Sequence, residues 1–126
     1  MGGRVSPLPR WAAAPRRSPP SESIESSLDR LFGELRAEKQ LTGLDQTQFA
    51  SRAAHFVNEV DAVHPFVKGN GRMQRAWLRQ LAGQAGYLLL LTGRDKEEWY
   101  RASAHGFYRS DAPMAALILR ATTPLA

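Results

Sequence analysis

The sequence contains no cysteine, which excludes both a disulfide framework and a thiolate metal site. It has only three histidines, and no two of them stand at the spacing of a metal-binding pair. No apolar run approaches the ~18 residues that a membrane-spanning helix needs. We therefore expect a cytoplasmic protein that has no membrane partner and no metal site of its own.

A basic surplus is also missing from the part of the chain that is expected to fold. Residues 1–20 carry four arginines and no acidic residue, whereas the remaining 13 basic and 12 acidic residues give a net charge of only +1. A nucleic-acid-binding domain carries its basic stripe on the fold itself. The charge distribution therefore disfavours direct binding of nucleic acid, although the whole chain has a formal charge of +5.

Residues 1–20 hold five of the eight prolines and show neither a helical nor an alternating period. We predict a disordered or loosely ordered segment that is rich in proline and arginine. Two alternatives stay open, because residues 1–6 fit an N-myristoylation pattern and the acid-free composition is typical of a transit peptide. Residues 21–126 are predicted to form one helical domain around a modest core.

Apolar residues at helical spacing predict four or five helices and little or no sheet. The first helix covers 24–39 after a serine cap, and a capping box of Asp45 and Gln48 opens the second. The other predicted elements are a helix over 72–85 that stops at Gly86, a buried extended segment over 87–91, a helix opened by a capping box of Asp95 and Glu98, and a last helix that starts at Pro113. This order predicts an all-α bundle.

One stretch, HPFVKGNGR at residues 64–72, places an imidazole, two glycines around an amide, and a guanidinium within nine positions. A Gly-Asn-Gly turn that opens into a helix presents backbone N–H groups at the positive end of the helix dipole, which favours an anion. Arg72 and Arg75 add planar donors that suit phosphate oxygens. His64 titrates near neutral pH and can act as a base. The stretch therefore indicates phosphoryl or nucleotidyl transfer.

HPFVKGNGR resembles the signature loop of Fic-domain proteins, HPFx[D/E]GN[G/K]R. Every fixed position matches except Lys68, which stands where the family has aspartate or glutamate. The flanking sequences LTGLDQTQFASRAAHFVNEVDAVHPF and GRMQRAWLRQLAGQAGY are similar to the helices beside this loop in the toxin-type branch of the family. The resemblance covers roughly residues 18–119. It implies a Fic-type helical bundle that is N-terminally truncated, because too few residues precede it for the family's earlier helices and β-hairpin flap.

The resemblance implies a protein adenylyltransferase, an enzyme that transfers AMP from ATP to a hydroxyl side chain of a target protein. In the family, the histidine that matches His64 deprotonates the target hydroxyl, which attacks the α-phosphate of ATP and releases pyrophosphate. His64 is thus the expected catalytic residue. The nucleotide-binding residues that the resemblance implies are Lys68, Gly69, Asn70, Gly71, Arg72 and Arg75.

Lys68 departs from the family at the position whose carboxylate holds Mg²⁺ in other members. Mg²⁺ prefers oxygen ligands, and an ammonium group repels it. ATP is therefore expected as the substrate, but the usual Mg²⁺ ligand is replaced. Two outcomes stay open: Lys68 contacts the phosphates and supplies part of the metal's charge, or the site binds nucleotide and scarcely turns it over.

The resemblance also implies partners. The expected target is a protein with a Ser, Thr or Tyr hydroxyl, typically a topoisomerase subunit in the toxin-type branch, and a small antitoxin is a further candidate. Residues 21–25 nearly fit the inhibitory motif [S/T]xxxE[G/N], but Ser26 follows Glu25, so a separate antitoxin is favoured over inhibition by Glu25. The alternatives to an active transferase are a catalytically impaired nucleotide- or partner-binding module and a small helical nucleic-acid-binding protein.

Overall fold

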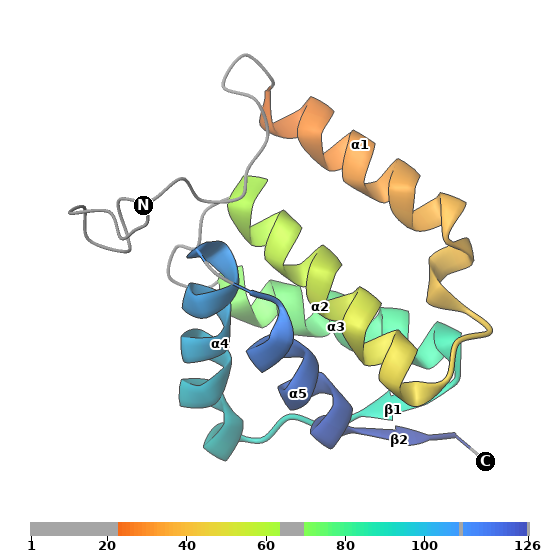
Figure 1. Ribbon diagram of the computed structural model, residues 1–126, viewed down its shortest axis with the longest axis vertical. Helices are drawn as coiled ribbons and strands as arrows, with labels where there is room; N and C mark the ends of the chain where they lie inside the picture. The colour runs from red at the N-terminus through yellow and green to blue at the C-terminus, as the bar shows by residue number, and fades with distance from the viewer. Residues whose placement is uncertain (1–22, 64–69, 109, 126) are drawn as a thin grey trace.

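A computed structural model of the chain describes residues 23–63, 70–108 and 110–125. Five α-helices and two short strands follow one another in these residues (Figure 1), which confirms the predicted all-α bundle and adds a small sheet. The elements are α1 (Ile24–Ala37), α2 (Gln46–Val63), α3 (Asn70–Ala85), β1 (Tyr87–Leu89), α4 (Lys96–Tyr108), α5 (Ala112–Ala121) and β2 (Thr122–Pro124). Two 3₁₀ turns, η2 (Lys39–Leu41) and η3 (Gly93–Asp95), lie in the connections before α2 and α4.

Several helix ends follow local signals in the sequence. Ser23 caps α1 by accepting a hydrogen bond from the Ser26 amide at 3.0 Å. The predicted box of Asp45 and Gln48 is present, because each side chain accepts a hydrogen bond from the other residue's amide, at 2.8 and 3.2 Å. Gly86 follows α3 with a φ of 97°, which glycine adopts without strain. These local predictions are confirmed.

The capping box before α4 lies one turn earlier than predicted. Thr92 Oγ1 accepts a hydrogen bond from the Arg94 amide at 3.2 Å, and Asp95 Oδ2 accepts one from the Thr92 amide at 2.8 Å. Asp95 thus closes a box with Thr92 and does not open one with Glu98. Both carboxylates bind Arg120 of α5 instead. In a capping box, an acidic residue can be either the cap itself or the residue three positions after the cap. The prediction was wrong because it took Asp95 as the cap, whereas Asp95 is the residue three positions after the cap Thr92.

The core forms around α2, against which α1, α3, α4 and α5 all pack. Its side chains include most of those that the helical spacing predicts. Five predicted ones are only half-buried: Leu28, Phe32, Val60, Trp77 and Ala85. The side chains of Phe107 and Tyr108, also predicted in the core, are not among those that the structure describes. The largest apolar side chains with no more than 1% exposure are Leu31, Leu41, Phe49, Phe56, Val57, Leu78, Trp99, Met114, Leu117 and Ile118.

The two strands pair antiparallel, with Tyr87 opposite Pro124, at the end of the bundle where the chain terminates (Figure 1). The segment after α3 is extended as predicted, but it is not buried throughout. Tyr87 and Leu89 are buried, whereas Leu88 and Leu90 are 45% and 61% exposed. Successive side chains of a strand point to opposite faces, and one face of this sheet meets the helices. The prediction of a wholly buried segment was therefore wrong in this respect.

The connection between α1 and α2 contains a left-handed turn. Lys39, Gln40 and Leu41 have φ values of 56°, 56° and 62°, although none of them is glycine. This conformation costs roughly 1–2 kcal/mol for each such residue. The turn is held because Leu41 is fully buried and its amide donates to the Glu38 carbonyl at 3.0 Å. The connection is thus a strained segment that core packing stabilises.

Replacing Lys39 with glycine should stabilise the fold. Lys39 is exposed, so the substitution removes left-handed strain without removing a core side chain. We expect the free energy of unfolding to rise by about 1 kcal/mol, measured by urea denaturation with circular dichroism. Gly43, with a φ of 80°, provides the control, since Gly43→Ala should lower the same quantity. A Lys39→Gly protein no more stable than wild type would contradict the prediction.

Candidate functional site

The two helices that flank HPFVKGNGR meet at one side of the molecule. α2 ends at Val63, directly before His64, and α3 begins at Asn70. Figure 1 shows the C-terminal end of α2 and the N-terminal end of α3 on the side away from the sheet. His64, Lys68 and Gly69 lie outside the described residues. The described helices therefore show where the stretch starts and ends.

α3 begins two residues before the predicted start at Arg72. Asn70 and Gly71 form its first positions, so they belong to the helix and not to the preceding loop. Amides in the first turn of a helix have no carbonyl partner within it. The positive end of the helix dipole lies at the same place. This correction places two of the predicted phosphate-binding residues where backbone donors are available to an anion.

A buried hydrogen bond joins the two helices beside the stretch. Gln74 Nε2 of α3 donates to Asp61 Oδ1 of α2, and both side chains are buried. The pair ties the end of α2 to the start of α3 and so restricts the separation of the two ends of the stretch. Sequence analysis did not identify it. The available signal was the spacing of these residues, since positions four apart lie on the same face of a helix. Asp61 comes four positions after the buried Val57, and Gln74 comes four positions before the buried Leu78.

Arg72 and Arg75, the predicted phosphate contacts, lie three positions apart near the start of α3. Arg72 is exposed, whereas Arg75 is half-buried. The Arg75 guanidinium carbon lies 5.8 Å from the centroid of the Trp99 ring of α4. A guanidinium over an indole face is attracted by the ring's electrons. The fully buried Trp99 therefore gives Arg75 a defined place between α3 and α4.

Two further cations lie beside these arginines. Arg79 of α3 and Lys96 of α4 line, together with Arg72 and Arg75, a cavity of about 240 Å³ between the two helices. Neither Arg79 nor Lys96 was among the predicted site residues. The available signal for Arg79 was the spacing of residues 72, 75 and 79, which lie along one side of a helix. The cluster of basic side chains thus extends beyond the first turn of α3 to Arg79 and to the start of α4.

The acidic residues near this cavity are already engaged. Asp95 also lines it, but its carboxylate accepts a hydrogen bond from the Thr92 amide and lies 3.2 Å from Arg120. The Thr92 hydrogen bond is the main cause that lowers the pKa of Asp95, and Arg120 lowers the pKa of Glu98 by hydrogen bonding. Both carboxyls therefore stay ionised at neutral pH. They are poor candidates for a group that exchanges protons in catalysis.

A buried amide links α2 to α4 and α5. Asn58 is fully buried, and its Nδ2 donates to Asp111 Oδ1, just before α5, at 2.8 Å. Asp111 Oδ2 in turn lies 3.7 Å from His55 Nδ1. Gly106 of α4 faces the same amide, and a Cβ at this position would overlap the Asn58 side chain. The C-terminal half of α2, which leads to His64, is therefore held by polar contacts as well as by the apolar core.

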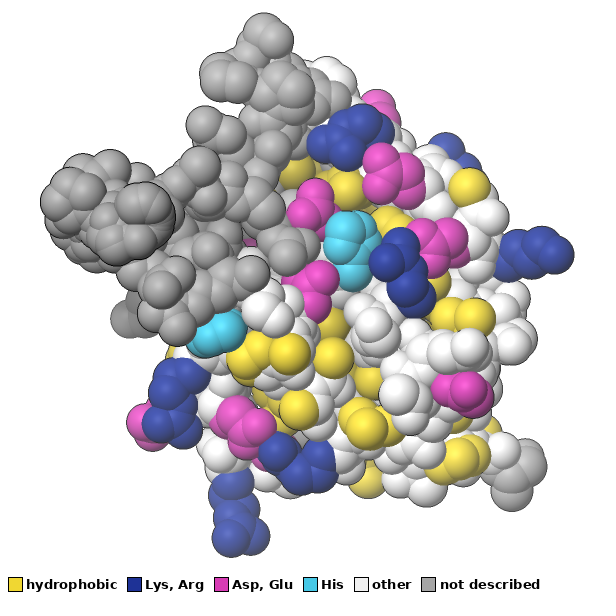
Figure 2. Space-filling view, in the orientation of Figure 1, with side chains coloured by type: hydrophobic (Ala, Val, Ile, Leu, Met, Phe, Trp, Pro, Cys, Tyr) yellow, Lys and Arg dark blue, Asp and Glu magenta, His cyan; other side chains and the backbone are white. Residues whose placement is uncertain are grey.

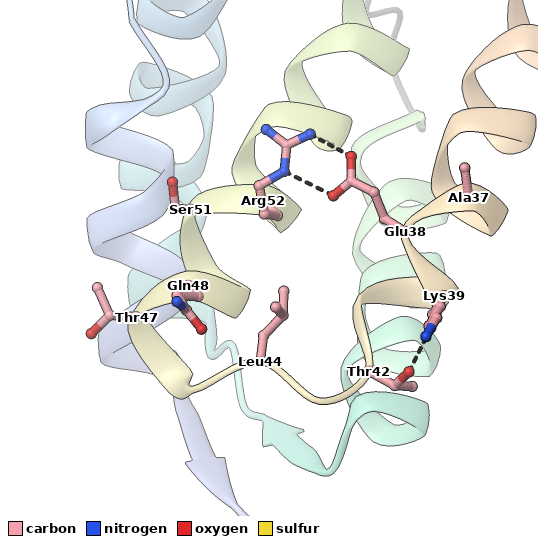
Figure 3. Close-up of a pocket in the computed structure, with 9 residues that line it drawn as sticks. All are labelled: Ala37, Glu38, Lys39, Thr42, Leu44, Thr47, Gln48, Ser51 and Arg52. Atoms are coloured by element: carbon pink, nitrogen blue, oxygen red, sulfur yellow. Dashed lines mark hydrogen bonds and ion pairs between the residues drawn. The ribbon is translucent and has the colours of Figure 1, made fainter.

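A larger hollow, of about 700 Å³, lies near the other end of α2 (Figure 3). Arg52 donates two hydrogen bonds to Glu38 there, at 2.9 and 2.5 Å, which lower the pKa of Glu38. Arg52 stands 11 residues before Val63, or about 16 Å along the helix axis. This acid and base neutralise each other, and none of the described residues of HPFVKGNGR (70–72) lines the hollow. We therefore place the candidate site at the other end of α2 in spite of the smaller cavity there.

The described part of the chain shows neither a metal centre nor a membrane-spanning helix. Within it, no group of three or more acidic, histidine or cysteine side chains could hold a metal ion. None of its helices is long and apolar enough to cross a membrane. On the face shown in Figure 2, basic side chains stand beside acidic ones and not in a continuous stripe. That face offers no basic track of the kind that binds a nucleic-acid backbone.

Residues 11–82 match the sequence profile of the Fic/DOC family, which is more than half of the chain. The chain belongs to this family. It is 39% identical to the "Protein adenylyltransferase VbhT" of Bartonella schoenbuchensis over 100 residues, which are 79% of this chain and 21% of that protein. It is 40% identical to the "Probable protein adenylyltransferase Fic" of Escherichia coli over 83 residues, which are 66% of this chain and 42% of that protein.

The fold agrees with solved Fic domains. An N-terminal Fic domain from Bartonella quintana, solved with bound ADP, matches with a TM-score of 0.73 and 31% identity. The match covers 88% of this chain and 56% of that one. The resemblance to the Fic family is thereby confirmed for sequence and fold. The chain spans between about a fifth and about half of the length of these similar proteins.

Proposed function

We propose that this chain is the transferase domain of a Fic-type protein adenylyltransferase, which transfers AMP from ATP to a Ser, Thr or Tyr hydroxyl of a target protein. The observation that carries the proposal is the position of HPFVKGNGR, between the end of α2 and the first turn of α3, in a member of the Fic/DOC family. Similar proteins are named as adenylyltransferases, and a similar domain binds ADP.

In the proposed reaction, His64 accepts the proton of the target hydroxyl. The hydroxyl oxygen then forms a bond to the α-phosphorus of ATP while the bond from that phosphorus to the bridging oxygen breaks. Pyrophosphate leaves with the electron pair of the broken bond, and AMP remains on the target. His64 suits this role because an imidazole titrates near neutral pH, and because Val63, the residue directly before it, is the last residue of α2.

The phosphate-binding groups in this proposal lie on α3 and directly before it. Backbone amides of Gly69, Asn70 and Gly71 bind phosphate oxygens, and the N-terminal end of the helix adds a favourable potential. Arg72 and Arg75 neutralise the phosphates beyond the reacting one. The contact between Arg75 and Trp99 supports this role, because a guanidinium that is already placed loses less conformational freedom when it binds an anion.

Mg²⁺, the ion expected from the family, does not fit the groups that this chain offers. Lys68 stands where the family has its carboxylate ligand. The described residues contain no group of three or more acidic, histidine or cysteine side chains that could replace it. We therefore assign no step of the reaction to a metal, and we include Lys68 among the nucleotide contacts as a cation that faces phosphate oxygens.

The proposed partners follow from the family alone. A target protein with an accessible hydroxyl is required by the reaction itself. A topoisomerase subunit as that target, a small antitoxin as an inhibitor, and a cytoplasmic location where ATP is abundant are finer proposals that follow from the resemblance to the toxin-type branch. The first two can be examined by transfer of label from ATP, with a purified topoisomerase added as the target or an antitoxin helix added as the inhibitor.

Lys68 favours a second candidate function, a nucleotide- or partner-binding module with little turnover. An ammonium in place of a metal ligand preserves attraction for phosphates but removes the group that would hold the metal. In this case the chain binds ATP through the same residues and transfers little AMP.

The test is transfer of label from α-³²P-ATP to proteins of a bacterial lysate, in wild type and in Lys68→Glu. We expect weak labelling by wild type in Mg²⁺ and a gain of about tenfold in Lys68→Glu, the effect of restoring one charge-assisted contact. Lys39→Glu makes the same charge change near the far end of α2 and should leave labelling unchanged. A fully active wild type with no gain in Lys68→Glu would refute the idea that a ligand is missing. No label from either protein, with ATP affinity intact, would favour the binding module.

A further inference from the structure

Four cations are among the residues that line the cavity between α3 and the segment before α4. Arg72, Arg75, Arg79 and Lys96 surround its volume of about 240 Å³. Lys96 is also the first residue of α4, so the positive end of that helix dipole lies at the same cavity. Cations that line one small cavity repel each other unless an anion lies between them. The arrangement therefore indicates a site for an anion.

The acidic groups of the described structure do not neutralise these cations. Within the described residues, no carboxylate forms an ion pair with Arg72, Arg75 or Arg79. Among the described residues that line the cavity, Asp95 is the one acidic residue, and its carboxylate is held by the Thr92 amide and by Arg120. The cavity thus keeps an excess of positive charge that an anion can neutralise.

Two of the residues that line the cavity also carry a buried donor without an acceptor. Arg75 Nη1 and Trp99 Nε1 are both shielded from solvent, and neither makes a hydrogen bond within the described residues. A buried donor without an acceptor is destabilising, and a ligand that brings acceptor oxygens removes the penalty. Both of these atoms are donors, so the missing partner must be an acceptor. An anion with several oxygens fits both this requirement and the charge.

We propose that Arg79 and Lys96 extend the phosphate site of Arg72 and Arg75 into this cavity, and that these two added cations make the site specific for a triphosphate over a diphosphate. The inference rests on the proposed function, which places the other phosphates at the start of α3. Arg72 lies in the first turn and Arg79 seven residues later, or ~10 Å along the axis. The described lining of the cavity therefore runs along α3 from its first turn to Arg79, about the span of a phosphate chain that starts at the N-terminal end of the helix.

The test is isothermal titration calorimetry of the whole chain with ATP, ADP and inorganic tripolyphosphate. In Arg79→Met and in Lys96→Met, we expect the affinity for ATP and for tripolyphosphate to fall about tenfold, as for the loss of one charge-assisted hydrogen bond. The affinity for ADP should change less than twofold. Arg94→Met is the matched control, because Arg94 is exposed next to the cavity but does not line it, and it should alter none of the three affinities.

Three results would overturn the inference: no binding of tripolyphosphate by wild type, an unchanged affinity for ATP in both variants, or an equal loss for ATP and ADP. A thermal melt of each variant, expected to match wild type, shows that the lost affinity is local. The inference and the proposed function can fail separately. If the two variants lose affinity for ATP but not for ADP, and wild type transfers no AMP, the cavity is supported and the proposed reaction is refuted. If wild type transfers AMP and the variants keep their affinity for ATP, the reaction is supported and the role of the cavity is refuted.

Discussion

His64→Ala should abolish AMP transfer while leaving ATP affinity within about threefold of wild type. A positioned base contributes about 10²–10⁴-fold to the rate of a proton-transfer step, so its removal should reduce labelling of the target by that factor. The groups proposed to bind the phosphates belong to residues 68–75, Arg79 and Lys96, and this substitution changes none of them. The measurement pairs α-³²P-ATP labelling with calorimetry on the same protein. Because Lys68 is expected to lower the activity of wild type, the comparison is made in the Lys68→Glu background as well.

A second histidine in α2 provides the control. His55 precedes His64 by nine residues, or ~13 Å of helix, and its nearest acidic partner is Asp111 at 3.7 Å. His55→Gln should therefore leave transfer unchanged. If His64→Ala still labels the target at the wild-type rate, the base is another group. If ATP affinity falls along with transfer, His64 acts in binding, and the proton transfer has to be assigned elsewhere.

The parts of the fold that could be predicted from sequence are those that depend on neighbours along the chain. The Ser23 cap, the box of Asp45 and Gln48, and the glycine after α3 each involve residues within a few positions, so residue type and spacing are sufficient. The left-handed turn at Lys39–Leu41 is also local, yet it was not predicted. Its residues do not favour that conformation, which is explained by the burial of Leu41 and by the hydrogen bond from its amide to Glu38.

In the candidate site too, the parts that depend on neighbouring residues could be predicted, and the parts that depend on residues far apart in the sequence could not. The HPFVKGNGR stretch could be located from its nine residues, because its chemistry lies in one short segment. The cavity could not be located from the sequence, because its residues are far apart in the chain. Lys96 comes 24 residues after Arg72, and the connection after β1 brings the start of α4 close to α3. Hydrogen bonds between helices show the same limit. Asp61 and Gln74 each looked like an ordinary polar position, and only the packing of α2 on α3 shows that both are buried partners.

Gly106→Ala should destabilise the fold by about 3 kcal/mol, because a methyl group there meets the buried Asn58 amide. Overpacking alone costs about 1–3 kcal/mol. Moving the Asn58 side chain away would also break its hydrogen bond to Asp111 at 2.8 Å and leave buried polar groups without partners. Urea denaturation measures the change. Gly83, exposed in α3 with nothing near its missing Cβ, is the control, since Gly83→Ala should stabilise the fold by about 0.5–1 kcal/mol.

A double mutant distinguishes this cause from a general intolerance of substitution at Gly106. Asn58→Ala by itself should destabilise, because it removes the hydrogen bond to Asp111 and leaves a cavity. In the Asn58→Ala background, however, Gly106→Ala has no amide to displace and its methyl group enters the vacated space. The double mutant should therefore be more stable than the sum of the single effects predicts, by about 1–3 kcal/mol. Additive effects, or equal effects of Gly106→Ala and Gly83→Ala, would show that contact with the Asn58 amide is not what requires glycine at this position.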